Sequence, residues 1–292
     1  MANLKEIRSR ITSVSSTKQI TNAMKMVSAA KLKRAQEAIT QMRPYANKLR
    51  ELMDNVSRSM TEDVNSEYTE KREVKNVLLI AITSNRGLAG AFNTNIIKEV
   101  NHLTQEEYKD KNVSILTIGK KVNDIVKKSH HIYANESDIW EDLSFKLSSN
   151  IAQRVMDAFV NKEFDEVRLV YNFFKNAANQ IVMNEAFLPI SIETPAQVEE
   201  ETKMGEVDYI FEPTKEEILL ELIPKTLKTQ LFKALLDSNA SEHGARMTSM
   251  HKATDNANDL IRDLTLQYNK ARQASITNEI LEIVGGADAL DG

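Results

Sequence analysis

Apolar residues recur at alternating steps of three and four along residues 245–284. The stretch contains neither glycine nor proline, so it predicts a single helix, roughly 60 Å long at the rise of an α-helix. Eight of the ten positions in the pattern are apolar, as in the seam of a coiled coil; the ten are Met250, Ala253, Ala257, Leu260, Leu264, Gln267, Ala271, Ala274, Asn278 and Leu281. Charged residues along the whole stretch exclude a membrane span. The pattern therefore predicts a helix that pairs with another helix.

The first part of the chain supplies that second helix. Thirteen of its seventeen seam positions are apolar, and the seam runs through Leu4, Ile7, Ile11, Val14, Lys18, Thr21, Lys25, Ser28, Leu32, Ala35, Ile39, Met42, Ala46, Leu49, Met53, Val56 and Met60. The four polar positions are consecutive, and nearby apolar residues move to Ile20, Met24 and Val27. We expect a local change of phase to interrupt the seam there. Because the seam keeps its register across Pro44, we expect the helix to continue through this proline.

The sequence between the two helices alternates between short apolar runs and amphipathic segments. This alternation predicts a mostly parallel α/β sheet. The predicted strands are 75–84, 112–119, 165–174 and 180–192, and the predicted helices are 90–107, 120–129 and 137–162. An acidic, loop-like stretch at 193–212 follows, with a short strand possible at 208–212.

Prolines and a glycine mark the return to the last helix. Pro213 suits the first turn of a helix that begins near Thr214. Pro224 is expected to bend or break that helix, and Gly244 is expected to be a weak point before the long seam.

The predicted fold is an α/β insert on a long antiparallel α-helical coiled coil, which the N- and C-terminal helices form together. The domains expected are an N-terminal shaft helix at 1–62, a Rossmann-like α/β insert at 75–192, an acidic connector at 193–212 and a C-terminal shaft helix at 213–287.

Charge is unevenly distributed along the chain. Residues 1–43 carry nine Lys or Arg against two Glu, although the net charge of the whole chain is −4. A basic arm on an acidic protein indicates an acidic partner surface, with a solvated helix face as the alternative. The chain has no cysteine, which excludes disulfides, thiolate metal sites and a catalytic cysteine. No apolar run is long enough to span a membrane.

One stretch resembles a nucleotide-binding loop. Ser84–Gly90 follows a buried strand and carries two glycines, but it matches neither the three-glycine dinucleotide motif nor the phosphate loop with its Lys-Ser/Thr ending. A tight structural turn is therefore the better interpretation, and a nucleotide-binding enzyme with a dimerising coiled coil is the alternative. Such an enzyme would have to bind nucleotide as an isolated chain.

Other site chemistry is weakly represented. His130 and His131 are adjacent in a predicted loop, and His243 and His251 are two helical turns apart, which is no recognisable zinc ligand set. We expect no metal, no cofactor and no catalytic residue. The basic arm has no aromatic residue before Tyr45 on which bases could stack, so a nucleic-acid adaptor, which would bind DNA or RNA in a salt-sensitive way, is a minor alternative.

The two ends of the chain resemble the γ subunit of F-type ATP synthases. The similarity lies in IRSRITSVSSTKQITNAMKMVSAAK (7–31), ARMTSMHKATDNANDLI (245–261) and YNKARQASITNEILEIVGGADA (268–289). The most specific marker is the spacing of Ile276, Thr277, Glu279, Glu282, Gly286 and Ala287. The similarity extends from end to end and is weaker in the insert.

The resemblance implies a central rotor shaft rather than an enzyme in its own right. In this family, proton flow turns a membrane c-ring, and the shaft drives three α and three β subunits through their catalytic states, or runs in reverse during hydrolysis. The implied partners are these subunits, the ε subunit and the c-ring, with one copy of the shaft per complex. The implied location is the cytoplasmic face of the bacterial inner membrane, as a peripheral subunit.

The resemblance also implies contact residues. Met24, Lys25 and Lys31 would face the lower part of the ring, and Arg272, Gln273, Thr277 and Glu279 would contact the ring from the last helix. The apolar tip, Ile280, Leu281, Ile283 and Val284, would turn in an upper bearing. Without a cysteine-bearing insertion we expect no thiol regulation, and the N-terminal sequence MANLKEIRSRI, which does not resemble a transit peptide, favours a bacterial protein.

Overall fold

The computed structural model describes residues 4–58, 67–190, 212 and 214–288. These residues form two compact units. Unit 1 comprises the chain up to Ala29 together with the chain from Arg246 onward, and unit 2 comprises Ala30–Ala245. Two long helices, α1 (Leu4–Arg58) and α5 (Lys215–Asp288), contribute to both units. The sequence analysis treated each helix as one domain; those domain limits stay a prediction, and the connector at 193–212 lies almost wholly outside the described residues.

Unit 2 contains a five-stranded sheet in the order β3-β2-β1-β4-β5. The strands are β1 (Asn76–Ile82), β2 (Asn112–Ile118), β3 (His131–Asn135), β4 (Glu166–Phe174) and β5 (Gln180–Leu188). The first four in this order run parallel, and β5 runs antiparallel to β4. The expectation of a mostly parallel α/β sheet is confirmed.

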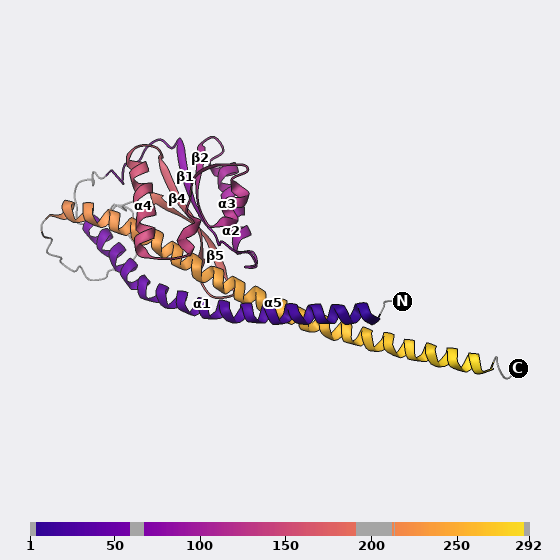
Figure 1. Cartoon of the computed structure of the whole chain (residues 1–292). Helices are drawn as coiled ribbons and strands as arrows, with labels where there is room; N and C mark the ends of the chain where they lie inside the picture. Colours follow the sequence, from indigo (N-terminus) through magenta and orange to yellow (C-terminus); the bar gives the residue numbers. More distant parts are fainter. Residues whose placement is uncertain (1–3, 59–66, 191–211, 213, 289–292) are drawn as a thin grey trace, which may run out of the picture. The chain divides into compact units, whose positions relative to one another are not determined.

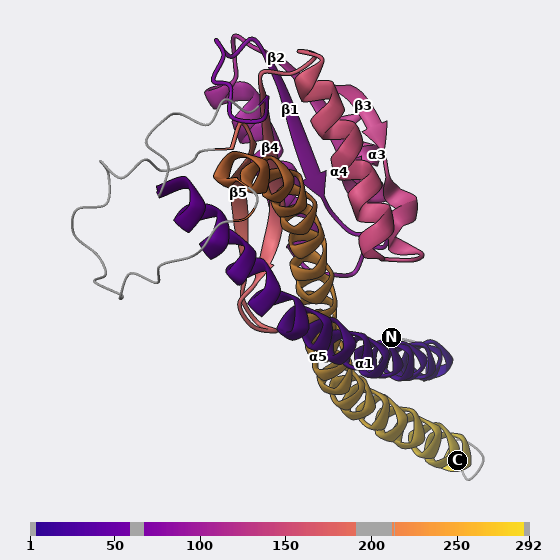
Figure 2. The ribbon, with the colours of Figure 1, turned by 90° about the vertical axis from the view of Figure 1, so that its left-hand side faces the viewer.

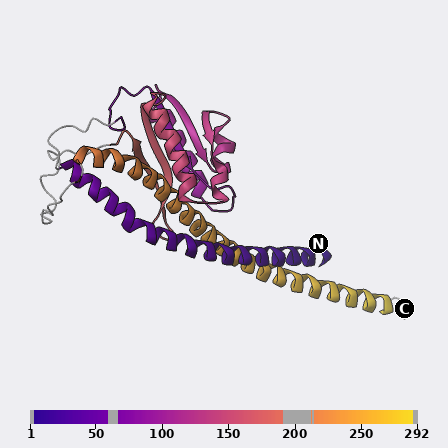
Figure 3. The ribbon, with the colours of Figure 1, turned by 60° about the vertical axis from the view of Figure 1, so that its left-hand side comes forward.

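Helices cover both faces of this sheet, as Figures 1 and 2 show. Leu78, Ile80 and Ile82 of β1 face α4 (Phe145–Val160) and the unit 2 parts of α1 and α5, whereas Val77 and Leu79 face α2 (Phe92–His102) and α3 (Lys120–Val126). Figure 3 shows α4 lying across its face of the sheet. Two short helical turns, η1 (Leu103–Glu107) and η2 (Ser137–Trp140), complete the insert. The predicted helix at 137–162 is therefore interrupted between η2 and α4.

Pro224 was expected to bend or break the helix, and it does not break it, because α5 is one helix from Lys215 to Asp288 with Pro224 inside it; a bend there stays a prediction. Leu219, Ile223, Leu227 and Leu231 form a fully buried stripe against the sheet on both sides of the proline. An interior proline costs about 3 kcal/mol, and burying each large aliphatic side chain contributes about 1.5–3 kcal/mol. The buried stripe therefore outweighs the cost of the proline. The expected continuation of α1 through Pro44 is confirmed.

Gly244 does not interrupt α5 either. A Cβ at this position would lie 3.2 Å from Ala177 Cα and 3.4 Å from a ring carbon of Phe174. The glycine therefore lets the turn between β4 and β5 approach the helix closely.

Unit 1 is an antiparallel pair formed by the first part of α1 and the last part of α5 (Figure 1). Thr21 Oγ1 lies 2.9 Å from Thr254 Oγ1, which defines the axial register. Counting outward from this contact in opposite directions pairs Val14 with Ile261, Ile11 with Leu264, Ile7 with Tyr268, and Lys25 with Met250. Each of these side chains is buried or half-buried. The two helices therefore share one continuous seam.

The predicted change of phase at residues 18–28 is wrong. Thr21 and Ser28 are buried in the seam, Lys18 and Lys25 are half-buried, and Ile20 and Val27 are exposed. Small and polar side chains are tolerated here because each hydroxyl bonds a carbonyl of its own helix, as Ser28 Oγ does to Met24 O at 2.7 Å. The seam keeps its phase, Ile20 and Val27 lie outside it, and Met24 is half-buried at its edge.

The predicted seam of α5 is half right. Met250, Ala257 and Leu264 are buried and Ala271 is half-buried, as expected. The alternate positions are shifted by one residue: Ile261, Tyr268 and Ser275 are more buried than the predicted Leu260, Gln267 and Ala274. The predicted and the observed seams of α5 both advance in steps of three and four residues, and they place similar residue types on neighbouring faces of the helix. Periodicity alone therefore could not distinguish one seam from the other.

Candidate functional site

The surface of unit 1 is the candidate site, because most of the residues that the family resemblance selected lie on it. On α1, Met24 and Lys25 are half-buried at the edge of the seam, beside the exposed Ile20 and Val27. These side chains form a mixed apolar and basic surface. Lys31 is exposed and belongs to unit 2.

The second group of predicted contact residues lies farther along α5. Arg272, Gln273, Thr277 and Glu279 are all exposed. Lys25 pairs with Met250, and Arg272 follows Met250 by about 33 Å of helix at 1.5 Å per residue. The structure therefore places the two predicted contact groups apart and does not form a single site from them.

The predicted tip at the end of α5 is exposed and apolar. Ile280, Leu281, Ile283 and Val284 are each more than half exposed, with Ile283 at 72%. Helix α5 continues past the first described residue of α1, which pairs with Ala271 in the register of unit 1 (Figure 1). Soluble proteins rarely expose apolar side chains in such a cluster unless the surface contacts a partner. The exposure of Gly286 and Ala287 is not described by the structure.

A groove where α1 begins was missed by the sequence reasoning. Its apolar floor comes from Leu4, Ile7, Ala271 and Ala274, and its rim carries Lys270, Glu279 and Glu282. Two acidic residues of the family marker, Glu279 and Glu282, thus lie beside an apolar floor. The sequence did contain a signal for this groove. The apolar seam of α1 begins at Leu4, whereas the apolar pattern of α5 continues beyond the residue that pairs with Leu4.

The Ser84–Gly90 turn is held by bonds within the protein. Ser84 Oγ donates to Arg86 O at 2.6 Å, and the backbone N–H of Ser84 donates to Asn93 Oδ1 at 3.0 Å. Asn85 accepts a bond from the backbone N–H of Lys120 and donates to Ser137 O. A phosphate-binding loop needs backbone N–H groups directed at its ligand. The turn uses its polar groups to connect the ends of neighbouring strands, which supports the structural interpretation.

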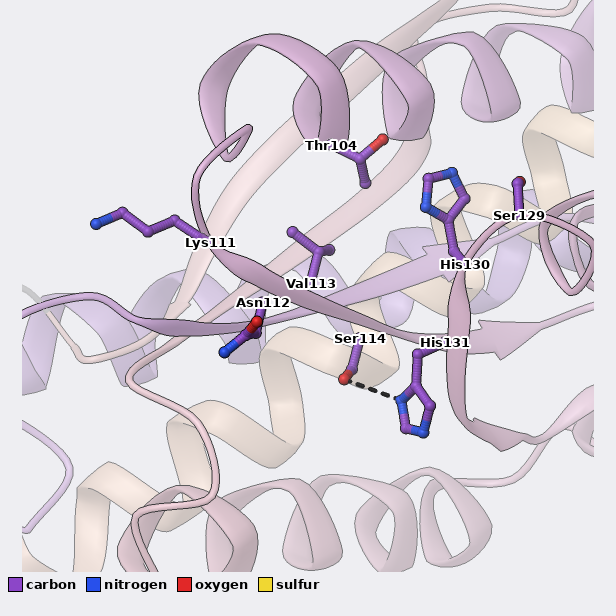
Figure 4. A pocket seen from close by; sticks show the side chains of 8 residues that line it. All are labelled: Thr104, Lys111, Asn112, Val113, Ser114, Ser129, His130 and His131. Carbon is purple, nitrogen blue, oxygen red and sulfur yellow. Dashed lines mark hydrogen bonds between the residues drawn. The ribbon is translucent and has the colours of Figure 1, made fainter.

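The histidines near β3 line a small surface pocket, shown in Figure 4. His131 was expected in a loop but is the first residue of β3, a strand that the sequence analysis missed. Its Nδ1 lies 3.2 Å from Ser114 Oγ, while the His130 ring points the other way. Burial lowers the pKa of His130. The described residues that line the pocket include no carboxylate that could orient His131.

Metal ligation and membrane insertion find no support in the described residues. Within them, no group of three or more His, Asp and Glu side chains could hold a metal ion. His251 instead pairs with Asp255 at 3.3 Å on the same helix. Among the helices that the structure describes, none carries an apolar stretch that could cross a lipid bilayer.

Comparison with known proteins identifies the family. The ATP-synt family, described as ATP synthase, matches residues 3–290. The ATP synthase gamma chain of Christiangramia forsetii is 62% identical over 292 residues, and that of Flavobacterium johnsoniae is 60% identical over 292 residues; each alignment covers all of both chains. The chain belongs to the ATP synthase gamma-chain family. It is accordingly a subunit of an enzyme complex.

Solved structures of this family share the fold. A chain of the Tetrahymena thermophila mitochondrial ATP synthase central stalk and c-ring is 26% identical with a TM-score of 0.58, and the match covers 80% of this chain and 99% of that one. A chain of the Euglena gracilis OSCP/F1/c-ring structure is 22% identical with a TM-score of 0.69, covering 98% and 94%. The fold predicted from the pattern of apolar residues, an α/β insert on paired terminal helices, is confirmed.

Proposed function

We propose that this chain is the central rotor shaft of an F-type ATP synthase. It transmits proton-driven rotation of the membrane ring to the catalytic hexamer, and it transmits rotation in the reverse direction during ATP hydrolysis. The observation that carries this proposal is the paired-helix unit 1, with its exposed apolar tip, in a chain whose family match spans residues 3–290. An apolar helix end that extends past its paired helix is suited to rotation inside a partner protein.

The shaft itself carries no catalytic site and needs no cofactor. The internal hydrogen bonds of the Ser84–Gly90 turn support this part of the proposal. The rival function, a nucleotide-dependent enzyme, would require a ligand-binding loop in place of that turn. ATP is bound and made by the partner subunits.

The partners are three α and three β subunits around the shaft, the ε subunit, and the membrane c-ring, with one shaft per complex. The bacterial origin of the relatives at 60–62% identity supports a location at the cytoplasmic face of the bacterial inner membrane. The chain is peripheral there and is attached through its partners. Nucleic acid is not among them.

Two surfaces contact the ring. The mixed apolar and basic surface around Met24 and Lys25 faces acidic segments of the catalytic subunits, and Lys31 of unit 2 also contacts them. The surface of Arg272, Gln273, Thr277 and Glu279 contacts the ring farther along α5, and the tip turns in an apolar bearing. The half-buried state of Met24 and Lys25 and the exposure of the α5 residues support these roles.

Co-expression tests the proposal directly. The chain is produced with the α and β subunits of its source, and ATP hydrolysis is measured for the chain alone, the hexamer alone and the purified complex. The expected result is an inert chain that enters the hexamer at one copy and raises its turnover. Nucleotide binding or hydrolysis by the chain alone, together with failure to join the hexamer, would overturn the proposal.

A further inference from the structure

Two threonines face each other in the seam of unit 1. Thr21 and Thr254 are each 8% exposed, and their Oγ1 atoms lie 2.9 Å apart. Each hydroxyl also reaches a carbonyl of its own helix, Lys18 O at 3.0 Å and Met250 O at 2.8 Å. The seam therefore contains a hydroxyl pair at a position where a coiled coil ordinarily has an apolar layer.

Each hydroxyl proton of this pair has two acceptors within reach. Two hydroxyl protons serve three contacts. When Thr254 donates to Met250 O, Thr21 donates to Thr254; when Thr21 donates to Lys18 O, Thr254 donates to Thr21. In either of these arrangements a bond joins the helices; when both hydroxyls donate to their own helices that bond is absent, and in all three arrangements each proton has an acceptor.

The apolar layers beyond the pair do not determine the axial position of the helices. A slip of one heptad would place Ile7 opposite Ile261, or Val14 opposite Tyr268. These layers are apolar in either register, because a heptad pattern repeats every seven residues. The slip that places Ile7 opposite Ile261 would also place Thr21 opposite Met247 and Thr254 opposite Val14, which offer no hydroxyl partner. The opposite slip would place Thr21 opposite Ile261 but Thr254 opposite the buried Ser28, so it would retain one hydroxyl pair.

We propose that Thr21 and Thr254 form a register lock, a hydrogen-bonded pair that fixes the axial position of α1 against α5 in unit 1. Both are positioning residues and touch no substrate. A single polar layer is known to select one register of a coiled coil at some cost in stability. The lock goes beyond the role of the shaft, and its test does not depend on that role.

Disulfide trapping in the full-length chain tests the lock, because the native sequence contains no cysteine. Val14→Cys with Ile261→Cys reports the native register. Val14→Cys with Tyr268→Cys, and Ile7→Cys with Ile261→Cys, report a slip of one heptad in either direction. Residues a heptad apart on paired helices are too distant to form a disulfide in the native register.

Thr21→Val with Thr254→Val is the decisive variant, since it keeps the side-chain shape and removes both hydroxyls. We expect the yield of the Ile7–Ile261 disulfide to rise about fivefold, corresponding to the loss of one neutral hydrogen bond, and the yield of the Val14–Tyr268 disulfide to rise less, because that slipped register also loses a hydroxyl pair, Thr254 with Ser28. Thr21→Ser with Thr254→Ser keeps both hydroxyls and should restore the native pattern. If Thr21 and Thr254 acted only through packing, the serine variant would raise the slipped disulfide yield and the valine variant would not.

Matched controls are available on both helices. Thr17 and Thr265 are exposed, and their hydroxyls bond only carbonyls of their own helices in the described structure, Ser13 O at 3.1 Å and Ile261 O at 2.7 Å. Thr17→Val with Thr265→Val should leave every cross-link yield unchanged. If the seam variant gave the same yields as this control, the lock would be refuted. The single variant Thr21→Val, which should also raise the slipped yields, serves as the same test where the double variant does not fold.

Discussion

At the scale of single residues, Gly119 is the position where the backbone leaves no choice of side chain. It lies between β2 and α3 with a φ of 119°, and a Cβ there would lie 2.2 Å from Thr83 O. Only glycine adopts this conformation without strain, and only glycine fits against that carbonyl. The contact holds the ends of β1 and β2 together beside the Ser84–Gly90 turn.

Gly119→Ala is therefore expected to lower the free energy of unfolding by more than about 2 kcal/mol, because strain and a backbone clash add. Urea unfolding followed by circular dichroism measures the loss. Gly285→Ala is the control, since a Cβ at Gly285 meets nothing within 4 Å. That variant should be neutral or gain about 0.5–1 kcal/mol of helix stability. Equal effects at the two glycines would contradict this explanation.

Lys25 offers the test of a single contact residue. Lys25→Glu reverses a charge on the surface that we assign to acidic segments of the ring, so coupled ATP synthesis should fall about tenfold, as expected for an interfacial charge pair made repulsive. Lys18→Glu is matched, because Lys18 is also half-buried, one heptad earlier in the same seam. The rate of ATP synthesis is measured in membrane vesicles for both variants. If Lys25→Glu lowered this rate no more than Lys18→Glu does, Lys25 would not belong to the contact surface.

At the scale of helices and strands, one ion pair joins three elements of unit 2. Arg43 of α1 bonds Asp237 of α5 at 3.3 Å and the backbone carbonyl of Phe174 in β4 at 3.4 Å, and its guanidinium lies over the Phe173 ring. The Asp237 side chain is fully buried, whereas that of Arg43 is 41% exposed. Burial raises the pKa of Asp237, and the Arg43 charge opposes that rise.

Arg43→Met should lower the free energy of unfolding at pH 7 by about 2 kcal/mol, below the range for fully buried pairs because Arg43 remains partly in water. The folded-state pKa of Asp237 lies above its unfolded value, so its contribution to stability is best at low pH and declines as pH rises. Without Arg43 this pKa rises further, so the deficit of the variant should shrink as pH falls from 7 toward 5. Unfolding measured across this range checks the sign.

Asp237→Asn in the Arg43→Met background is the control for that pH dependence. It removes the buried carboxyl, so the deficit should no longer vary with pH in that window. A deficit that stayed constant in Arg43→Met itself would show that lost packing on Phe173, rather than the charge, causes the effect.

Most elements of the fold were predictable, and the errors have identifiable causes. Buried runs such as Asn76–Ile82 predicted their strands because a doubly covered sheet needs continuous apolar residues. The strand at His131–Asn135 was missed because it is a short edge strand without fully buried residues. The seam at Thr21 was misread because hydroxyls that bond their own helix can be buried in it. The tip was predictable through the family marker, but the groove depends on where two helices end.

At the scale of the whole molecule, the apolar tip should matter for the assembled complex and not for folding. Ile280→Ser with Ile283→Ser changes side chains that are already more than half exposed, so the unfolding midpoint should shift by less than about 2 °C. Turnover of the assembled complex under load should fall severalfold, because the bearing loses apolar contact.

Leu266→Ser is the matched control for the tip. Leu266 is 61% exposed on the same helix and lies outside the tip. Single-molecule rotation or proton pumping by the complex should distinguish the two. If both variants rotated as the native chain does, the tip would not be a bearing surface.

Among the described residues, the register of unit 1 pairs no residue of α1 with the part of α5 beyond Ala271, so the isoleucines there are hydrated whenever the chain is alone. Enclosing that end must release ordered water, and the enthalpy of assembly should therefore become more negative with rising temperature, the thermal signature of apolar burial. Entry of the shaft into its ring is then driven by the release of water from the end of α5, and cooling should weaken this assembly.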